Sequence, residues 1–90
     1  MTANDTWNVR RLSIAIIRQA VVDYVRARNY ISTYSGDNQR VQQVSHAKRT
    51  IDECERFFRS RYFELLNPYP LLTGEDIITK LRNDSIGVIA

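Results

Sequence analysis

The stretch STYSGDN, residues Ser32–Asn38, decides the fold because it holds the clearest helix-breaking signal in the first two-thirds of the chain. Gly36 is the only glycine or proline that precedes Pro68. A glycine at this position can adopt the left-handed conformation that ends a helix, and Asp37 or Asn38 can cap the helix that follows. We therefore predict a long helix on each side, and so short a loop makes the two helices antiparallel neighbours.

Apolar residues recur at steps of three and four on both sides of this loop, which is the spacing of an amphipathic helix. The spacing predicts a first helix of about 25 residues from about Trp7 to Ser32 and a second from about Asn38 to Ser60. Strict alternation of apolar and polar residues, which would indicate strands, is missing from this part of the sequence. The first two-thirds of the chain are therefore predicted to be a helical hairpin.

Two shorter helices are predicted after the hairpin. Ser60 is placed to cap a helix that ends before the turn Asn67–Pro70, because a residue before proline leaves the helical region. Thr73 is placed to cap a last helix that runs to about residue 83, with Glu75 and Asp76 near its positive end.

The predicted fold class is all-α: a long antiparallel helical hairpin capped by two short C-terminal helices. Ninety residues allow one hydrophobic core, so we predict a single helical domain over residues 1–90, with residues 1–6 and 85–90 flexible. The residues predicted to form its core are Ile14, Ile17, Val21, Tyr24, Val44, Ile51, Cys54, Phe58, Phe63, Leu66, Ile77 and Leu81.

The composition favours a cytoplasmic protein. A single cysteine, Cys54, forms no disulfide within the chain, which fits a reducing compartment. No run of apolar residues approaches the ~20 needed to span a bilayer, and the start of the chain does not resemble a signal peptide. We therefore predict no membrane partner.

The sequence offers little equipment for catalysis. The only histidine, His46, lies eight residues before Cys54, so on one helix the two side chains are about 12 Å apart along the axis. A nucleophile and its base must be in contact, and a zinc site needs three or four ligands. We predict no catalytic residue, no metal site and no cofactor, and we expect that the protein is not an enzyme.

Positive charge is concentrated in the first predicted helix. The net charge is +3, and the segment from Asn8 to Ser32 holds five arginines against one acid, Asp23. Such a basic helix would follow the phosphates of nucleic acid without reading its sequence. DNA is therefore an alternative partner, bound by Arg10, Arg11, Arg18, Arg26 and Arg28.

The segment ECERFFRSRYFELLNPYP, residues Glu53–Pro70, combines aromatic residues with arginines. Phe58 and Phe63 are interpreted as core, because each buried aromatic removes on the order of 150–250 Å² from water. Arg59, Arg61 and Tyr62 are instead predicted to face outward as a surface that binds an acidic partner.

A second apolar surface is expected on the first helix, beside its main stripe. Two such hairpins can bury these side chains against each other in a four-helix core, so a homodimer is one hypothesis. The residues concerned are Leu12, Ile16, Ala20, Tyr30 and Tyr34.

Several motifs between residues 14 and 83 resemble a family of small proteins from phages and mobile elements of Gram-positive bacteria. The motifs are Asp23-Tyr24, the FFRS block Phe57–Ser60, the pair Tyr62-Phe63 and the segment Gly74–Leu81. The chain departs from the family at Asn67–Pro70, where an acidic linker is expected. The resemblance implies a regulatory or DNA-related role. From all these features we expect a non-catalytic accessory or regulatory protein that acts by binding another protein.

Overall fold

A computed structural model describes the backbone of residues 2–69 and 71–89 and the side chains of residues 10–69 and 71–83. The element order is α1 (Thr2–Tyr34), the 3₁₀ helix η1 (Asn38–Arg40), α2 (Val41–Phe58), α3 (Arg61–Leu66) and α4 (Gly74–Ile89). The predicted all-α fold class is confirmed: the chain is 85% helical, and the described residues include no strand.

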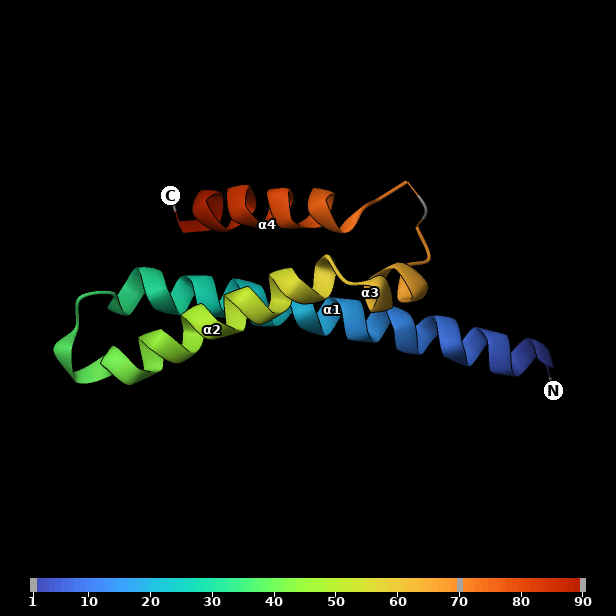
Figure 1. Cartoon of the computed structure of the whole chain (residues 1–90), viewed down its shortest axis with the longest axis horizontal. Helices are drawn as coiled ribbons and strands as arrows, with labels where there is room; N and C mark the ends of the chain where they lie inside the picture. Colours follow the sequence, from blue (N-terminus) through green and yellow to red (C-terminus); the bar gives the residue numbers. More distant parts are fainter. Residues whose placement is uncertain (1, 70, 90) are drawn as a thin grey trace.

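The predicted loop joins α1 and α2 as antiparallel neighbours (Figure 1). Gly36 has a φ of 93°, in the left-handed region that glycine adopts without strain. Asp37 then caps η1, because its side chain accepts a hydrogen bond from the backbone N–H of Gln39 at 2.9 Å. The hairpin is therefore set by the residues that the sequence pattern indicates.

The predicted ends of the helices differ from the observed ones. α1 begins at Thr2 and ends at Tyr34, so the prediction that begins it at Trp7 is five residues late. α4 extends to Ile89, beyond the predicted end near residue 83. The flexibility predicted for residues 1–6 and 85–90 falls on side chains outside the described part of the chain, and it stays a prediction.

α3 and α4 close the hairpin in different ways. Figure 1 shows α3 at the end away from the loop, beside the N-terminal half of α1, and α4 running back along the hairpin in the direction of α1. Gly74 begins α4 directly against the last turn of α2, where an added Cβ would lie 1.7 Å from the carbonyl oxygen of Phe58. A residue without a side chain is therefore required at this contact.

The core lies where α4 covers α1, α2 and α3. Tyr24, Phe58, Phe63 and Ile78 are the largest fully buried side chains, and Ile78 is a core residue that the predicted set omits. The other predicted core residues that are buried are Val44, Cys54 and Leu81. The remaining predicted core residues are partly buried: Ile14, Ile17, Val21, Ile51, Leu66 and Ile77.

Candidate functional site

Exposed apolar side chains gather at the end of the molecule that α3 closes. Of the seven large apolar side chains that are exposed in the described part of the chain, five lie between residues 62 and 72. Leu71 is 95% exposed and Leu65 is 75% exposed. We call Leu65, Tyr69, Leu71 and Leu72 the loop surface, because three of the four lie in the loop between α3 and α4.

Asn67 fixes the shape of this loop. Its side-chain NH₂ donates to the carbonyl oxygen of Leu72 at 2.6 Å, and its side-chain oxygen accepts from the N–H of Tyr69 at 3.0 Å. The N–H of Leu72 also donates to the carbonyl oxygen of Tyr69 at 3.0 Å. Pro68, which lies between Asn67 and Tyr69, restricts the backbone there. These hydrogen bonds join the two ends of the loop that presents the loop surface.

The loop is attached to the core through α3. The hydroxyl oxygen of Ser60 accepts from the N–H of Phe63 at 3.1 Å, which confirms Ser60 as the cap of this helix. The ring of Phe63 is 1% exposed and meets the ring of Phe58 edge-on, with centroids 5.5 Å apart. One face of α3 is thus held in the core, while Leu65 on the same helix faces solvent.

The three residues predicted to bind a partner differ in what they can do. Arg59 is already engaged, because its guanidinium donates to the carboxylate of Glu75 and lies 3.7 Å from Glu55. Arg61 is exposed. Tyr62 is 55% exposed, and its ring lies 6.1 Å from that of Phe57. Arg61 and Tyr62 remain candidates for contact with a partner, whereas Arg59 joins α2 to α4.

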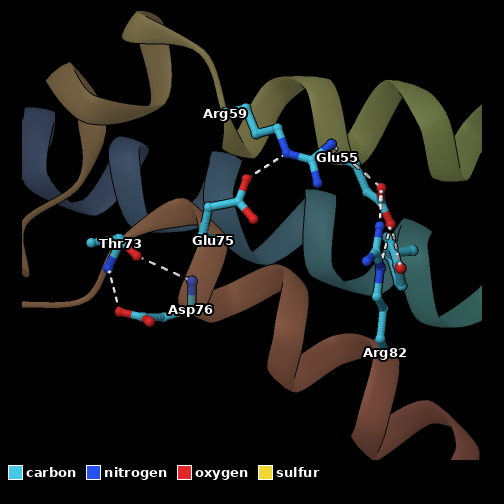
Figure 2. Close-up of polar contacts among 7 residues, drawn as sticks. Glu55, Arg59, Thr73, Glu75, Asp76 and Arg82 are labelled. Atoms are coloured by element: carbon cyan, nitrogen blue, oxygen red, sulfur yellow. Dashed lines mark hydrogen bonds and ion pairs between the residues drawn. The ribbon is translucent and has the colours of Figure 1, made fainter.

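A buried polar cluster joins α1, α2 and α4 (Figure 2). Glu55 accepts hydrogen bonds from the hydroxyl of Tyr24 at 2.8 Å and from two nitrogens of Arg82 at 2.8 and 3.1 Å. The hydrogen bonds from Arg82 lower the pKa of Glu55, against the opposing effect of burial. Burial and the neighbouring carboxylate raise the pKa of Tyr24. Glu55 therefore carries a charge that its partners stabilise.

The sequence analysis did not identify a role for Glu55. The signal was present, because Glu55 lies four residues after Ile51 and three before Phe58, on the apolar side of α2. Arg82 likewise lies four residues after Ile78, on the side of α4 that faces the hairpin. An acid and a base on two apolar stripes predict an ion pair between the helices only once the two helices are known to pack together.

The five arginines predicted to bind nucleic acid do not share one face. Arg10, Arg11, Arg18 and Arg26 are exposed on α1. Arg28 is partly buried and donates to the backbone carbonyl of Arg82 at 3.5 Å, on the side that α4 covers. Arg26 lines a groove between α1 and α2. Arg11 and Arg18, seven residues apart, are the pair that helical geometry aligns.

A groove runs between α1 and α2, and among the described side chains only those of these two helices line it. One part, of about 750 Å³, extends from Asp23 and Glu53 to Tyr30 and Gln42. A second part, of about 320 Å³, shares Asp23 and Glu53 and continues to Ile16 and Phe57. We call the whole feature the hairpin groove.

His46 and Cys54 do not form a reactive pair. His46 is exposed in the hairpin groove, and Cys54 is buried, which together with nearby acids raises the pKa of its thiol to about 11. Among the described side chains, no three of the types His, Cys, Asp and Glu come together as a metal site requires. In the same part of the chain, no helix combines the length and apolarity needed to cross a bilayer.

In comparisons with known proteins, no family model, no curated protein and no solved structure matches this chain.

Proposed function

We propose that this protein is a non-catalytic accessory or regulatory protein that binds another protein through the loop surface. The observation that carries this proposal is Leu71, which is 95% exposed in a loop where the Asn67 side chain bonds the backbone of Tyr69 and Leu72. Apolar side chains that water surrounds contribute little to folding. They gain free energy when a partner covers them, at about 25 cal/mol per Å².

The ordered loop also lowers the cost of binding. A flexible segment loses conformational entropy when a partner immobilises it, whereas the bonds made by Asn67 restrict this loop in advance. Tyrosine and leucine side chains that project from such a loop can act as anchors in a pocket of the partner. The matching chemistry is an apolar pocket, with acidic groups near Arg61 at its rim.

A photo-crosslinking amino acid at position 71 tests this proposal. In lysate of the cells that make the protein, we expect a discrete crosslinked protein, which mass spectrometry identifies. The same amino acid at Lys48, which is exposed on α2, is the matched control. The partner should bind Leu71→Ser at least about tenfold more weakly than the unchanged chain. Equal crosslinking from positions 48 and 71 would contradict the proposal.

Nucleic acid binding is the second candidate, favoured by the exposure of Arg10, Arg11 and Arg18 along one continuous helix. Affinity for random duplex DNA should then fall steeply between about 50 and 200 mM salt, because released counterions drive such binding. Replacing these three arginines with glutamate should abolish it. An unchanged chain that shows no DNA binding at low salt would remove this candidate.

A further inference from the structure

Small side chains contribute to the lining of the hairpin groove. Ala20 and Ala27 of α1 and Ala47 of α2 line it between larger neighbours. It extends along α1 from Ile16 to Tyr30, which is about 21 Å at 1.5 Å per residue. Of the α4 residues whose side chains are described, 74–83, none lines it. A second pair of helices can therefore place its side chains in the holes between these residues.

Charged side chains of both signs line the groove near its middle. Asp23 of α1 and Glu53 of α2 line the same section, where the two parts of the groove overlap. Arg26 follows Asp23 by three residues, about 4.5 Å farther along α1. The side chains of Arg26 and Glu53 are exposed, and that of Asp23 is partly buried. An acidic section thus lies beside a basic one near the middle of the groove.

Aromatic side chains flank this charged centre at matching distances. Phe57 lines the groove four residues, about one turn, beyond Glu53. Tyr30 lines it four residues beyond Arg26, in the opposite direction. Both rings are partly buried. Read along the groove, the order is aromatic, acidic, basic, aromatic.

We propose that the hairpin groove binds a second copy of this chain, turned by a two-fold axis that passes between Asp23 and Arg26. The rotation brings Arg26 of each copy against Asp23 and Glu53 of the other. It also brings Phe57 of each copy against Tyr30 of the other. The two hairpins then form a four-helix core, while α4 stays on the outside of each copy.

The order of the groove residues favours a second copy over an unrelated helix. A two-fold axis requires a surface that is complementary to itself, so that residue i meets residue j and j meets i. The groove meets this condition because, about one centre, Arg26 corresponds to Asp23 and Glu53, and Phe57 corresponds to Tyr30. The dimer does not depend on the loop surface, which takes no part in the groove.

Charge reversal tests the proposal by sedimentation velocity on the full chain. The unchanged chain should be a dimer with a dissociation constant in about the micromolar range. Arg26→Glu should weaken the dimer by at least about tenfold, because symmetry applies each new repulsion twice. The double variant Asp23→Arg with Glu53→Arg should weaken the dimer to a similar extent. Arg18→Glu carries the same charge change on an exposed part of α1 outside the groove and should leave the dimer intact.

Mixing the two reversed variants gives the decisive result. Each variant repels a second copy of itself. In the mixture, the glutamate at position 26 of the first variant faces the arginines at positions 23 and 53 of the second, so a heterodimer should form. Far-UV circular dichroism should show each variant as helical as the unchanged chain. A monomeric unchanged chain at about 1 mM, an Arg26→Glu dimer as tight as the original, or a mixture that stays monomeric would overturn the proposal.

Discussion

Glu55 places a carboxylate on the buried side of α2, where an unpaired charge would cost several kcal/mol. Its oxygens accept three hydrogen bonds, one from the hydroxyl of Tyr24 and two from the guanidinium of Arg82. Because Tyr24 belongs to α1 and Arg82 to α4, one side chain joins three helices. At the scale of single residues, this carboxylate fixes how α4 lies on the hairpin.

Replacing Glu55 with glutamine should lower the free energy of unfolding by about 1–3 kcal/mol. An amide has one acceptor oxygen, so its NH₂ group would face the guanidinium donors of Arg82. Urea unfolding at neutral pH, followed by far-UV circular dichroism, measures the loss. Asp52→Asn, an equal change at an exposed position of α2, should shift stability by no more than about 0.5 kcal/mol.

The Glu55 carboxylate also predicts that the stability of the folded protein depends on pH. Its pKa is lowered in the folded protein, so the unfolded chain binds the proton more readily, with a pKa of about 4.3. The stabilisation is present above that value and is lost as pH falls through the folded pKa. Between about pH 5 and pH 3, the urea midpoint of the unchanged chain should fall more steeply than that of Glu55→Gln. Parallel curves would show that Glu55 does not titrate in this way.

Cys54 should react slowly with disulfide reagents while the protein is folded. Only the thiolate reacts, and a pKa of about 11 leaves about a hundredfold less thiolate at pH 8 than an ordinary cysteine has. Reaction in guanidinium should be at least that much faster, because unfolding also exposes the buried sulfur. Equal rates in the two conditions would mean that Cys54 is open to solvent.

At the scale of elements, the short helices depend on their first residues. In α4, the hydroxyl oxygen of Thr73 accepts from the N–H of Asp76, and the Asp76 carboxylate accepts from the N–H of Thr73, each at 3.1 Å (Figure 2). This reciprocal pair satisfies two N–H groups that a helix start leaves without partners. It confirms the predicted role of Thr73 as the cap.

Thr73→Ala should cost about 1 kcal/mol of stability, because the N–H of Asp76 loses its acceptor. Thr73→Ser keeps a hydroxyl and should retain most of that free energy. Thr79→Ala, at an exposed position inside α4, is the matched control and should be neutral or slightly stabilising, since alanine is the better helix former. Thermal unfolding of the three variants side by side gives the comparison.

At the scale of the whole molecule, the protein is elongated. Its extents are 55 × 23 × 21 Å and its radius of gyration is 15.5 Å, against about 12 Å for a compact domain of this length. One core nevertheless includes side chains from α1, α2, α3 and α4. From the shared core we predict that the four helices unfold together.

Ile78→Ala should therefore destabilise the entire chain by about 2–5 kcal/mol, in one cooperative transition. Ile78 is 1% exposed and belongs to the cluster that contains Tyr24 and Phe58. Leu71→Ala removes a comparable aliphatic side chain at a position that is 95% exposed, and it should change stability by less than about 0.5 kcal/mol. Two separate transitions in Ile78→Ala would mean that α4 unfolds independently of the hairpin.

The sequence by itself determined the elements, because their signals are local. Gly36, Ser60 and Thr73 act within a few residues of their own positions, so spacing and caps were enough to predict the hairpin and two later helices. Only the tertiary structure decided which faces meet. The hydrogen bonds between Arg82 and Glu55 join residues 27 positions apart. The hydrogen bond from Arg28 to the backbone carbonyl of Arg82 joins residues 54 positions apart. Spacing places Glu55 and Arg82 on the apolar sides of their helices but does not show that they meet, since packing depends on distances in space rather than along the chain.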